Sequence, residues 1–286
     1  RGAQLHRAAC ARDGGDMMFK VLDIFSGIGG FSLGLERTGG FKTTAFCEID
    51  PFCRKVLAKH WPKVPCYEDV RTLTADALSR DGIAVDVICG GFPCQDVSYA
   101  GRRAGLGDTR SGLWSEYARL VGELRPRFVI VENTPGLLSL GMGHVLGDLA
   151  ALGLDAEWHS ISAAGIGAPH IRDRVWICAY APGLFGRAII RGEPDGDLPG
   201  DATARVYPDA NSTQRPLWQG IGGHLAAQLA AIERSGGGVR AWDRGPFDDG
   251  QVDDGLSTPV DALDAYGNAV IPKITEMIGR AILQAA

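Results

Sequence analysis

The sequence predicts an α/β fold in which a doubly wound, mostly parallel sheet is joined to a small irregular domain. Short apolar runs alternate with segments of helical periodicity between Phe19 and Tyr180, and this alternation is typical of βαβ units. Several of these runs end in glycine or polar residues, and ligands of such sheets bind at the carboxyl ends of strands. Glycine makes up 40 of the 286 residues, about twice its usual share of about 7%, which favours loops that approach a ligand closely.

The first half of the predicted sheet alternates three strands with two helices. We expect strands over 19–25, 43–48 and 64–67, because each is a short run of apolar and β-branched residues. A helix over 31–38 follows a glycine loop and ends at a Gly-Gly pair. A second helix runs to about His60, with Asp50 as its N-cap and Pro51 at its first position.

The second half continues the pattern and ends in an amphipathic helix. We expect strands over 85–89, 128–131 and 175–180, and helices over 113–124 and 143–151. Near the C-terminus, apolar residues recur at the spacing of one helix face, which must pack on another element. They are Ile274, Met277, Ile278, Ala281 and Ile282.

Two segments lack this periodicity. Residues 1–16 have no apolar pattern and are interpreted as a disordered extension. Residues 182–254 are rich in Gly, Pro and Asp and are interpreted as a separate small domain. The net charge of -5 excludes a general polyanion binder, so any contact with nucleic acid must come from a locally basic surface.

Cysteine usage indicates a reducing compartment. The seven cysteines are odd in number and none are spaced C-x-x-C, which argues against a disulfide framework and a structural metal site. No apolar run approaches the 18 or so residues of a membrane span. We therefore expect a cytoplasmic protein with no metal and no membrane contact.

The glycine loop after the first strand is a candidate nucleotide site. Ser26-Gly-Ile-Gly-Gly30 lets a ligand approach the backbone, and its spacing suits a cofactor without a pyrophosphate better than a dinucleotide. Glu48, which ends the next strand, is placed to bind ribose hydroxyls, and Asp69 could accept a hydrogen bond from an adenine amino group. The alternative interpretation is a tight turn with two surface acids.

Cys94 is a candidate nucleophile. It follows the strand that ends at Cys89, behind a proline that fixes the backbone. Its thiol would need a lowered pKa or a nearby proton acceptor in order to react. The alternative, a small buried side chain, is the usual state of a free cysteine. It suits Cys47, Cys53, Cys66, Cys89 and Cys178, which lie in or next to apolar segments.

Glu132 and two arginines are candidate partners of that cysteine. A half-buried carboxyl group at a strand end can have a raised pKa and donate a proton, although Glu132 could instead cap a turn. Arg172 and Arg174 alternate along an extended segment, so both can face one cleft. The alternative there is a solvated charge run at a strand edge.

In their order and spacing these groups resemble the DNA (cytosine-5-) methyltransferase family, from Phe19 to the C-terminus. The resemblance implies a class I S-adenosylmethionine-dependent methyltransferase with a Rossmann-like fold. It implies transfer of a methyl group from S-adenosyl-L-methionine, leaving S-adenosyl-L-homocysteine, to carbon 5 of a flipped cytosine in a specific sequence of double-stranded DNA. The matching motifs are Asp23-Ile-Phe-Ser-Gly-Ile-Gly-Gly30, Glu48-Ile-Asp50, Gly91-Phe-Pro-Cys-Gln95, Glu132-Asn133, Arg172-Asp-Arg174 and Gly267-Asn-Ala-Val270.

The same resemblance implies a role for each matched residue. Cys94 would attack carbon 6 of cytosine, Glu132 would bind ring nitrogen 3 and the amino group, and Arg172 and Arg174 would hold the base. Phe25 and Ile49 would sandwich the adenine. The implied cofactor-binding set is Asp23, Phe25, Ser26, Gly27, Gly29, Gly30, Glu48, Ile49, Asp69, Val70, Gly91, Pro93, Asn268 and Ala269. A loop over 95–114 would close on the DNA through Gln95, Ser98, Arg102, Arg103 and Arg110.

The resemblance also implies a domain organisation. Residues 17–181 would form the first part of the catalytic and cofactor-binding domain, 182–254 a target-recognition domain, and 255–286 a return segment that completes the catalytic domain. His170 and Thr134 depart from the usual Gln and Val of the family. The recognition segment carries seven arginines against eleven acids, an unusual balance for a DNA reader.

Two other functions stay open from the sequence. A relative of the family acts on transfer RNA, so this site could serve RNA. The acidic recognition segment would also suit a binding or regulatory protein that keeps the fold without turnover. For the enzyme, we expect a monomer that is functionally paired with a restriction endonuclease without stable contact.

Overall fold

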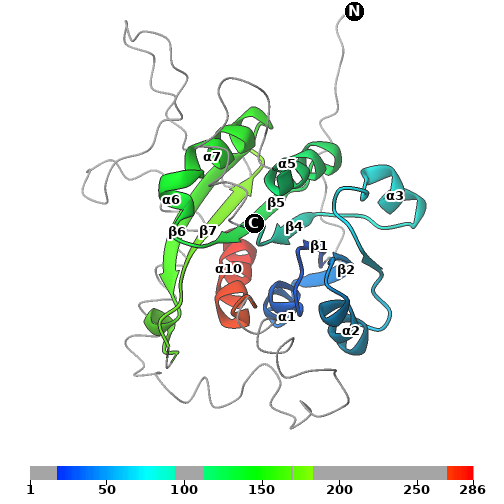
Figure 1. Ribbon diagram of the computed structural model, residues 1–286, viewed down its shortest axis with the longest axis horizontal. Coiled ribbons are helices and arrows are strands. Elements are labelled where there is room, and N and C mark those ends of the chain that lie inside the picture. Colours follow the sequence, from blue (N-terminus) through cyan, green and yellow to red (C-terminus); the bar gives the residue numbers. More distant parts are fainter. Residues whose placement is uncertain (1–17, 94–111, 169, 183–268, 286) are drawn as a thin grey trace, which may run out of the picture.

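The computed structural model describes residues 18–93, 112–168, 170–182 and 269–285. These residues form one seven-stranded sheet in the order β3-β2-β1-β4-β5-β7-β6, flanked by helices (Figure 1). The strands are β1 (Phe19–Ile24), β2 (Phe41–Cys47), β3 (Cys66–Tyr67), β4 (Val87–Gly90), β5 (Phe128–Asn133), β6 (Asp155–Ser162) and β7 (Asp173–Tyr180). The helices are α1 (Gly30–Glu36), α2 (Pro51–His60), α3 (Ala75–Arg80), α5 (Gly112–Leu124), α6 (Leu137–Leu140), α7 (Met142–Ala151), the 3₁₀ turn η1 (Ala164–Ile166) and α10 (Pro272–Ala285).

The sheet confirms the predicted mostly parallel α/β fold. Strands β3, β2, β1, β4 and β5 are parallel, and β7 runs antiparallel to both β5 and β6. Because parallel neighbours end at the same edge, the residues that follow β1, β2 and β4 lie together with the end of β5. This edge carries the candidate site residues.

Helices cover both faces of the sheet. One face packs against α1 and α10, around Phe31, Leu35, Ile274 and Ile278. The opposite face packs against α3, α5 and α7. Figure 1 shows α10, in red, beside α1 although the two are far apart in the sequence.

The contact between α1 and α10 is tight enough to require glycine. A Cβ atom added to Gly34 would lie 1.9 Å from Oγ1 of Thr275 and 2.1 Å from the carbonyl oxygen of Pro272. The Thr275 hydroxyl donates to the carbonyl of Gly30 at 3.3 Å. The last helix therefore packs directly on the helix that follows the glycine loop.

Most predicted elements are present with shifted ends. Asp50 caps α2 as predicted, since its carboxylate accepts hydrogen bonds from the amides of Phe52 and Cys53 at 2.7 and 2.9 Å. Strand β2 begins two residues earlier than expected because Phe41 pairs with Phe19 of β1. The residues of 1–16 and almost all of 182–254 lie outside the described residues, as does the first part of 255–286.

No helix in the described ranges is long and apolar enough to span a bilayer. The same ranges contain no cluster of three or more His, Cys, Asp or Glu side chains arranged to hold a metal ion.

Candidate active site

The glycine loop between β1 and α1 has an unusual backbone. Phe25, Gly27 and Gly29 all have positive φ, at 52°, 53° and 86°. A left-handed conformation is costly for a residue with a bulky side chain such as Phe25, and such residues cluster at functional sites. The Ser26 hydroxyl stabilises this turn by donating a hydrogen bond to the carbonyl of Asp23 at 2.6 Å.

Glu48 fixes the loop from the neighbouring strand. Its Oε2 accepts a hydrogen bond from the amide of Gly27 at 2.7 Å, and its Oε1 accepts one from the amide of Asp50 at 2.8 Å. A Cβ atom at Gly27 would meet no atom within 4 Å, so the space beside the α-carbon of Gly27 is open. Ile49 is 64% exposed, an uncovered apolar side chain next to an anchored carboxylate.

Asp23 lies beneath the loop with no exposed surface. Its Oδ2 accepts hydrogen bonds from the hydroxyl and the amide of Ser32 at 2.7 and 3.3 Å. Burial raises the pKa of this carboxyl group to about 8, because desolvation disfavours the charged form. Asp23 and Ser26, expected among the cofactor-binding residues, are thus both buried and shape the loop from inside.

The segment after β3 presents one partly exposed acid and one buried apolar residue. The Asp69 carboxylate pairs with Arg71 at 2.7 Å, and the hydrogen bond from Arg71 holds the pKa of Asp69 below its usual range. Val70 is buried, and its carbonyl accepts a hydrogen bond from Arg119 of α5 at 2.9 Å. Helix α5 also supports Phe25, whose ring stacks on Tyr117 with centroids 6.4 Å apart.

Glu132 and Arg174 form an ion pair at the end of β5. The guanidinium Nε of Arg174 lies 2.9 Å from Oε1 of Glu132. Glu132 is buried, with 8% of its surface exposed. Burial raises the pKa of Glu132, while the charges of Arg174 and Arg172 partly oppose the shift. Arg172 donates to the carbonyl of Ala269 at 3.0 Å, which ties the segment before β7 to the segment before α10.

The loop after β4 lies directly against this ion pair. A Cβ atom at Gly91 would be 2.7 Å from Oε2 of Glu132. The side-chain amide of Asn133 donates to the carbonyl of Phe92 at 2.9 Å. The loop is described as far as Pro93, and Cys94 is the next residue along the chain.

Several predicted site residues lie outside the described ranges, so their predicted roles stay predictions. These are Cys94, Gln95, Ser98, Arg102, Arg103, Arg110 and Asn268. The five described cysteines, in contrast, do not carry an activated thiol. Burial raises the pKa of Cys47 and Cys53 to about 12 and that of Cys66 to about 11, and it also raises those of Cys89 and Cys178 well above the usual value of a thiol.

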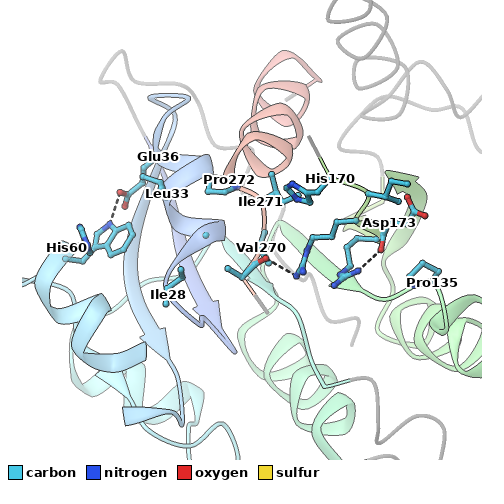
Figure 2. A pocket seen from close by; sticks show the side chains of 16 residues that line it. Ile28, Leu33, Glu36, His60, Pro135, His170, Asp173, Val270, Ile271 and Pro272 are labelled. Carbon is cyan, nitrogen blue, oxygen red and sulfur yellow. Dashed lines mark hydrogen bonds between the residues drawn. The ribbon is translucent and has the colours of Figure 1, made fainter. Parts of the chain in front are cut away.

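A pocket of about 990 Å³ opens between the glycine loop and the two arginines. Figure 2 shows side chains from α1, the end of α2, the start of β7 and the segment before α10 around it. Arg172 and Arg174 both line it, as predicted from their alternation. Gly30 also lines it, and a Cβ atom there would lie 2.4 Å from the carbonyl oxygen of Val270.

The sequence pattern did not single out several residues of this pocket. Glu36, Trp61 and Pro135 are part of its lining, whereas Phe25, Glu48 and Ile49 lie outside it. Trp61 and Glu36 belong to different helical segments and meet only in the fold, through a hydrogen bond of 2.9 Å. No local spacing links them, so this pair could not be found from periodicity.

Comparison with known proteins identifies relatives along most of this region. The sequence profile of C-5 cytosine-specific DNA methylases matches residues 19–204. The chain is 35% identical over 168 residues to the type II methyltransferase M2.BsuMI of Bacillus subtilis, covering 56% of this chain and 41% of that protein. It is 31% identical over 175 residues to the type II methyltransferase M.AquIA of Picosynechococcus, covering 55% and 70%. With M1.ScrFI of Lactococcus lactis included, at 53%, the chain spans about half the length of the curated relatives it matches.

Solved structures share the fold. A prophage-encoded protein of E. coli that is assigned to DNA modification superposes with a TM-score of 0.57 at 21% identity, covering 93% of this chain and 99% of that chain. A DNMT2 variant of Spodoptera frugiperda superposes with a TM-score of 0.51 at 15% identity. These two likenesses support the α/β Rossmann-like architecture.

Proposed function

Because the chain belongs to the C-5 cytosine-specific DNA methylase family, we propose that it transfers a methyl group from S-adenosyl-L-methionine to carbon 5 of cytosine in double-stranded DNA. One observation carries this proposal beyond family membership. The loop that leads to Cys94 packs against Glu132, a buried carboxyl group paired with Arg174. A nucleophile and a proton donor on adjacent strand ends suit this reaction.

Carbon 5 of cytosine is a weak nucleophile while the ring is aromatic. The Cys94 thiolate adds to carbon 6, and the electron pair of the 5,6 double bond moves onto carbon 5, which then attacks the methyl group. Covalent catalysis of this kind replaces one difficult step by easier ones. Loss of the carbon 5 proton and departure of the thiolate restore the ring.

Glu132 stabilises the addition by donating a proton or hydrogen bond to ring nitrogen 3. The raised pKa of its buried carboxyl group supports this role, since a raised pKa favours the protonated form that can donate. Arg174 orients the carboxyl group through the 2.9 Å contact, and Arg172 adds positive charge beside it. Preorganised charge of this kind stabilises developing negative charge.

The target carbon is inaccessible within a stacked duplex, so the cytosine must be flipped into the site. The pocket beside Arg172 and Arg174 is the place where the flipped base would enter. We also propose that the segment 95–110 contacts the DNA through Gln95, Ser98, Arg102, Arg103 and Arg110.

The residues around the glycine loop fit the proposed cofactor. The open space beside the α-carbon of Gly27, the anchored Glu48 carboxylate and the exposed Ile49 side chain suit a ligand that is polar at the ribose and apolar at the adenine. S-adenosyl-L-methionine supplies an electrophilic methyl group on a sulfonium and leaves as S-adenosyl-L-homocysteine. Phe25, Glu48, Ile49, Asp69, Val70 and Ala269 would hold it, while Asp23 and Ser26 support the loop.

Transfer of a labelled methyl group to mixed-sequence DNA tests the proposal. We expect the unmodified protein to label DNA and Cys94→Ala to lose the activity. Cys66→Ala is the matched control, because that half-buried thiol is not activated. Equal labelling by the unmodified protein and Cys94→Ala would overturn the mechanism. Label in transfer RNA alone would overturn the choice of DNA, and DNA binding without turnover would favour a binding protein.

The wider setting is proposed on the same basis. Relatives are named type II methyltransferases, which supports functional pairing with a restriction endonuclease without stable contact. We propose a monomer that acts in the cytoplasm, and its mass in solution with and without DNA would test the first of these statements.

A further inference from the structure

We propose that Trp61 is a positioning residue for the cofactor, which holds the glycine loop in its binding conformation at Gly29. The inference rests on the proposed function and adds a residue to it. Trp61 follows the last residue of α2 and lines the pocket beside Ile28. Its contact with the glycine loop is the route by which it would act on the cofactor.

The indole ring packs directly on Gly29. A Cβ atom at Gly29 would lie 2.7 Å from Cζ3 and 2.8 Å from Cη2 of Trp61, and 3.0 Å from Cδ2 of Leu57. No gap therefore separates the ring from the loop backbone at its last residue before α1. Gly29 has a φ of 86°, a conformation that only glycine adopts readily.

The orientation of the ring is fixed by a partly buried network. The indole Nε1 donates to Oε2 of Glu36 at 2.9 Å, and Oε1 of Glu36 accepts the amide of Thr43 at 2.8 Å. In Figure 2 the dashed line beside Glu36 marks the bond to the indole. The ring also packs on Phe46 of β2, with centroids 5.3 Å apart. Trp61 is thus held at α1 and β2 while it presses on the loop.

The loop is consequently held at two positions. Glu48 accepts a hydrogen bond from the Gly27 amide at 2.7 Å, and the Trp61 ring packs on Gly29. Without the indole, the two left-handed glycines are free to sample other conformations, and cofactor binding must order them again. We expect about a tenfold loss of affinity, which is the cost of ordering the backbone of about one residue.

Calorimetric titration of the full chain with S-adenosyl-L-methionine, together with steady-state methyl transfer, tests the proposal. For Trp61→Leu we expect the dissociation constant and the cofactor KM to rise about tenfold, with kcat at saturating cofactor within about twofold of the unmodified protein. Trp61→Phe keeps a ring on Gly29 and should recover most of the affinity. Glu36→Gln cannot accept both hydrogen bonds and should weaken binding without removing the ring.

Trp158→Leu is the matched control, because Trp158 is a 39% exposed tryptophan on β6 at the opposite edge of the sheet. It should leave the dissociation constant unchanged. Should the unmodified protein not bind the cofactor at all, the proposed function fails. If it binds while both Trp61→Leu and Glu36→Gln bind equally well, the positioning role alone is overturned. A fall in kcat as large as the fall in affinity would also overturn it, since that indicates a general structural role.

Discussion

Gly91→Ala would displace the Glu132 carboxylate by a distance that follows from the structure. The added Cβ would lie 2.7 Å from Oε2 of Glu132, whereas ordinary contacts between carbon and oxygen begin at about 3.4 Å. The carboxylate must therefore move by about 0.7 Å, away from the position in which Arg174 holds it at 2.9 Å. Misplacement of a catalytic group by about 1 Å costs about 100-fold in rate, so we expect kcat to fall by about that factor.

The assay is methyl transfer at saturating cofactor and DNA, with thermal unfolding measured in parallel. Stability should change little, because the atom that moves is the end of a side chain. Gly136→Ala is the neutral control, since its Cβ would meet only Oγ1 of Thr134 at 3.6 Å. Gly90→Ala is the opposite control, because its Cβ would lie 2.1 Å from the backbone carbonyl of Ile24 and should destabilise the fold.

Turnover by folded Gly91→Ala at the rate of the unmodified protein would contradict this expectation. Such a result would mean that the position of the Glu132 carboxylate is not required for methyl transfer.

Three further predictions concern charge and packing. Arg174→Gln removes a charge that lowers the Glu132 pKa, so the alkaline decline of kcat should move to higher pH; an unmoved decline contradicts the assignment of Glu132 as proton donor. The pKa of Asp23 is raised to about 8 in the folded protein, whereas the unfolded chain releases this proton near pH 4. The free energy of unfolding, measured in urea, should therefore fall by up to about 1.4 kcal/mol per pH unit between pH 4 and 8. That slope should flatten in Asp23→Asn, and an equal slope contradicts the raised pKa. Gly34→Ala places a Cβ 1.9 Å from Oγ1 of Thr275 and should destabilise the fold by about 1–3 kcal/mol, measured by denaturant unfolding.

Gly147→Ala is the control for the packing prediction. A Cβ there would meet no atom within 4 Å, and alanine is favoured over glycine inside a helix by about 0.5–1 kcal/mol. A destabilised Gly147→Ala would mean that the loss in Gly34→Ala does not come from the contact with α10.

The predicted fold depends on strands whose apolar pattern is strong. Strands β1, β4 and β5 lie in the centre of the sheet, and most of their residues are buried and apolar. Strand β6 escaped prediction, because its residues Asp155–Ser162 include few apolar side chains and, among the strands that the structure describes, β7 alone pairs with it. An edge strand of this composition is specified by its neighbour more than by its own residues.

The candidate site was predictable where polar residues follow strands directly. Glu48 and Glu132 were found in this way, and Arg174 was found from its alternation with Arg172. The sequence could not indicate whether Asp23 and Ser26 face the cofactor or the protein interior, because side chains at a strand end can point in either direction. Asp23 is buried against Ser32 of α1, and this packing depends on tertiary structure rather than on the local sequence.

The contact between Thr275 and Gly30 spans 245 positions of the chain, and this separation has a consequence for synthesis. Ribosomes add about 5–20 residues per second, so α1 leaves the ribosome about 10–50 s before its partner helix exists. During that interval the side of α1 that packs on α10 has nothing to cover it. The nascent protein should depend on chaperones, and it should gain cofactor affinity only after translation has passed α10.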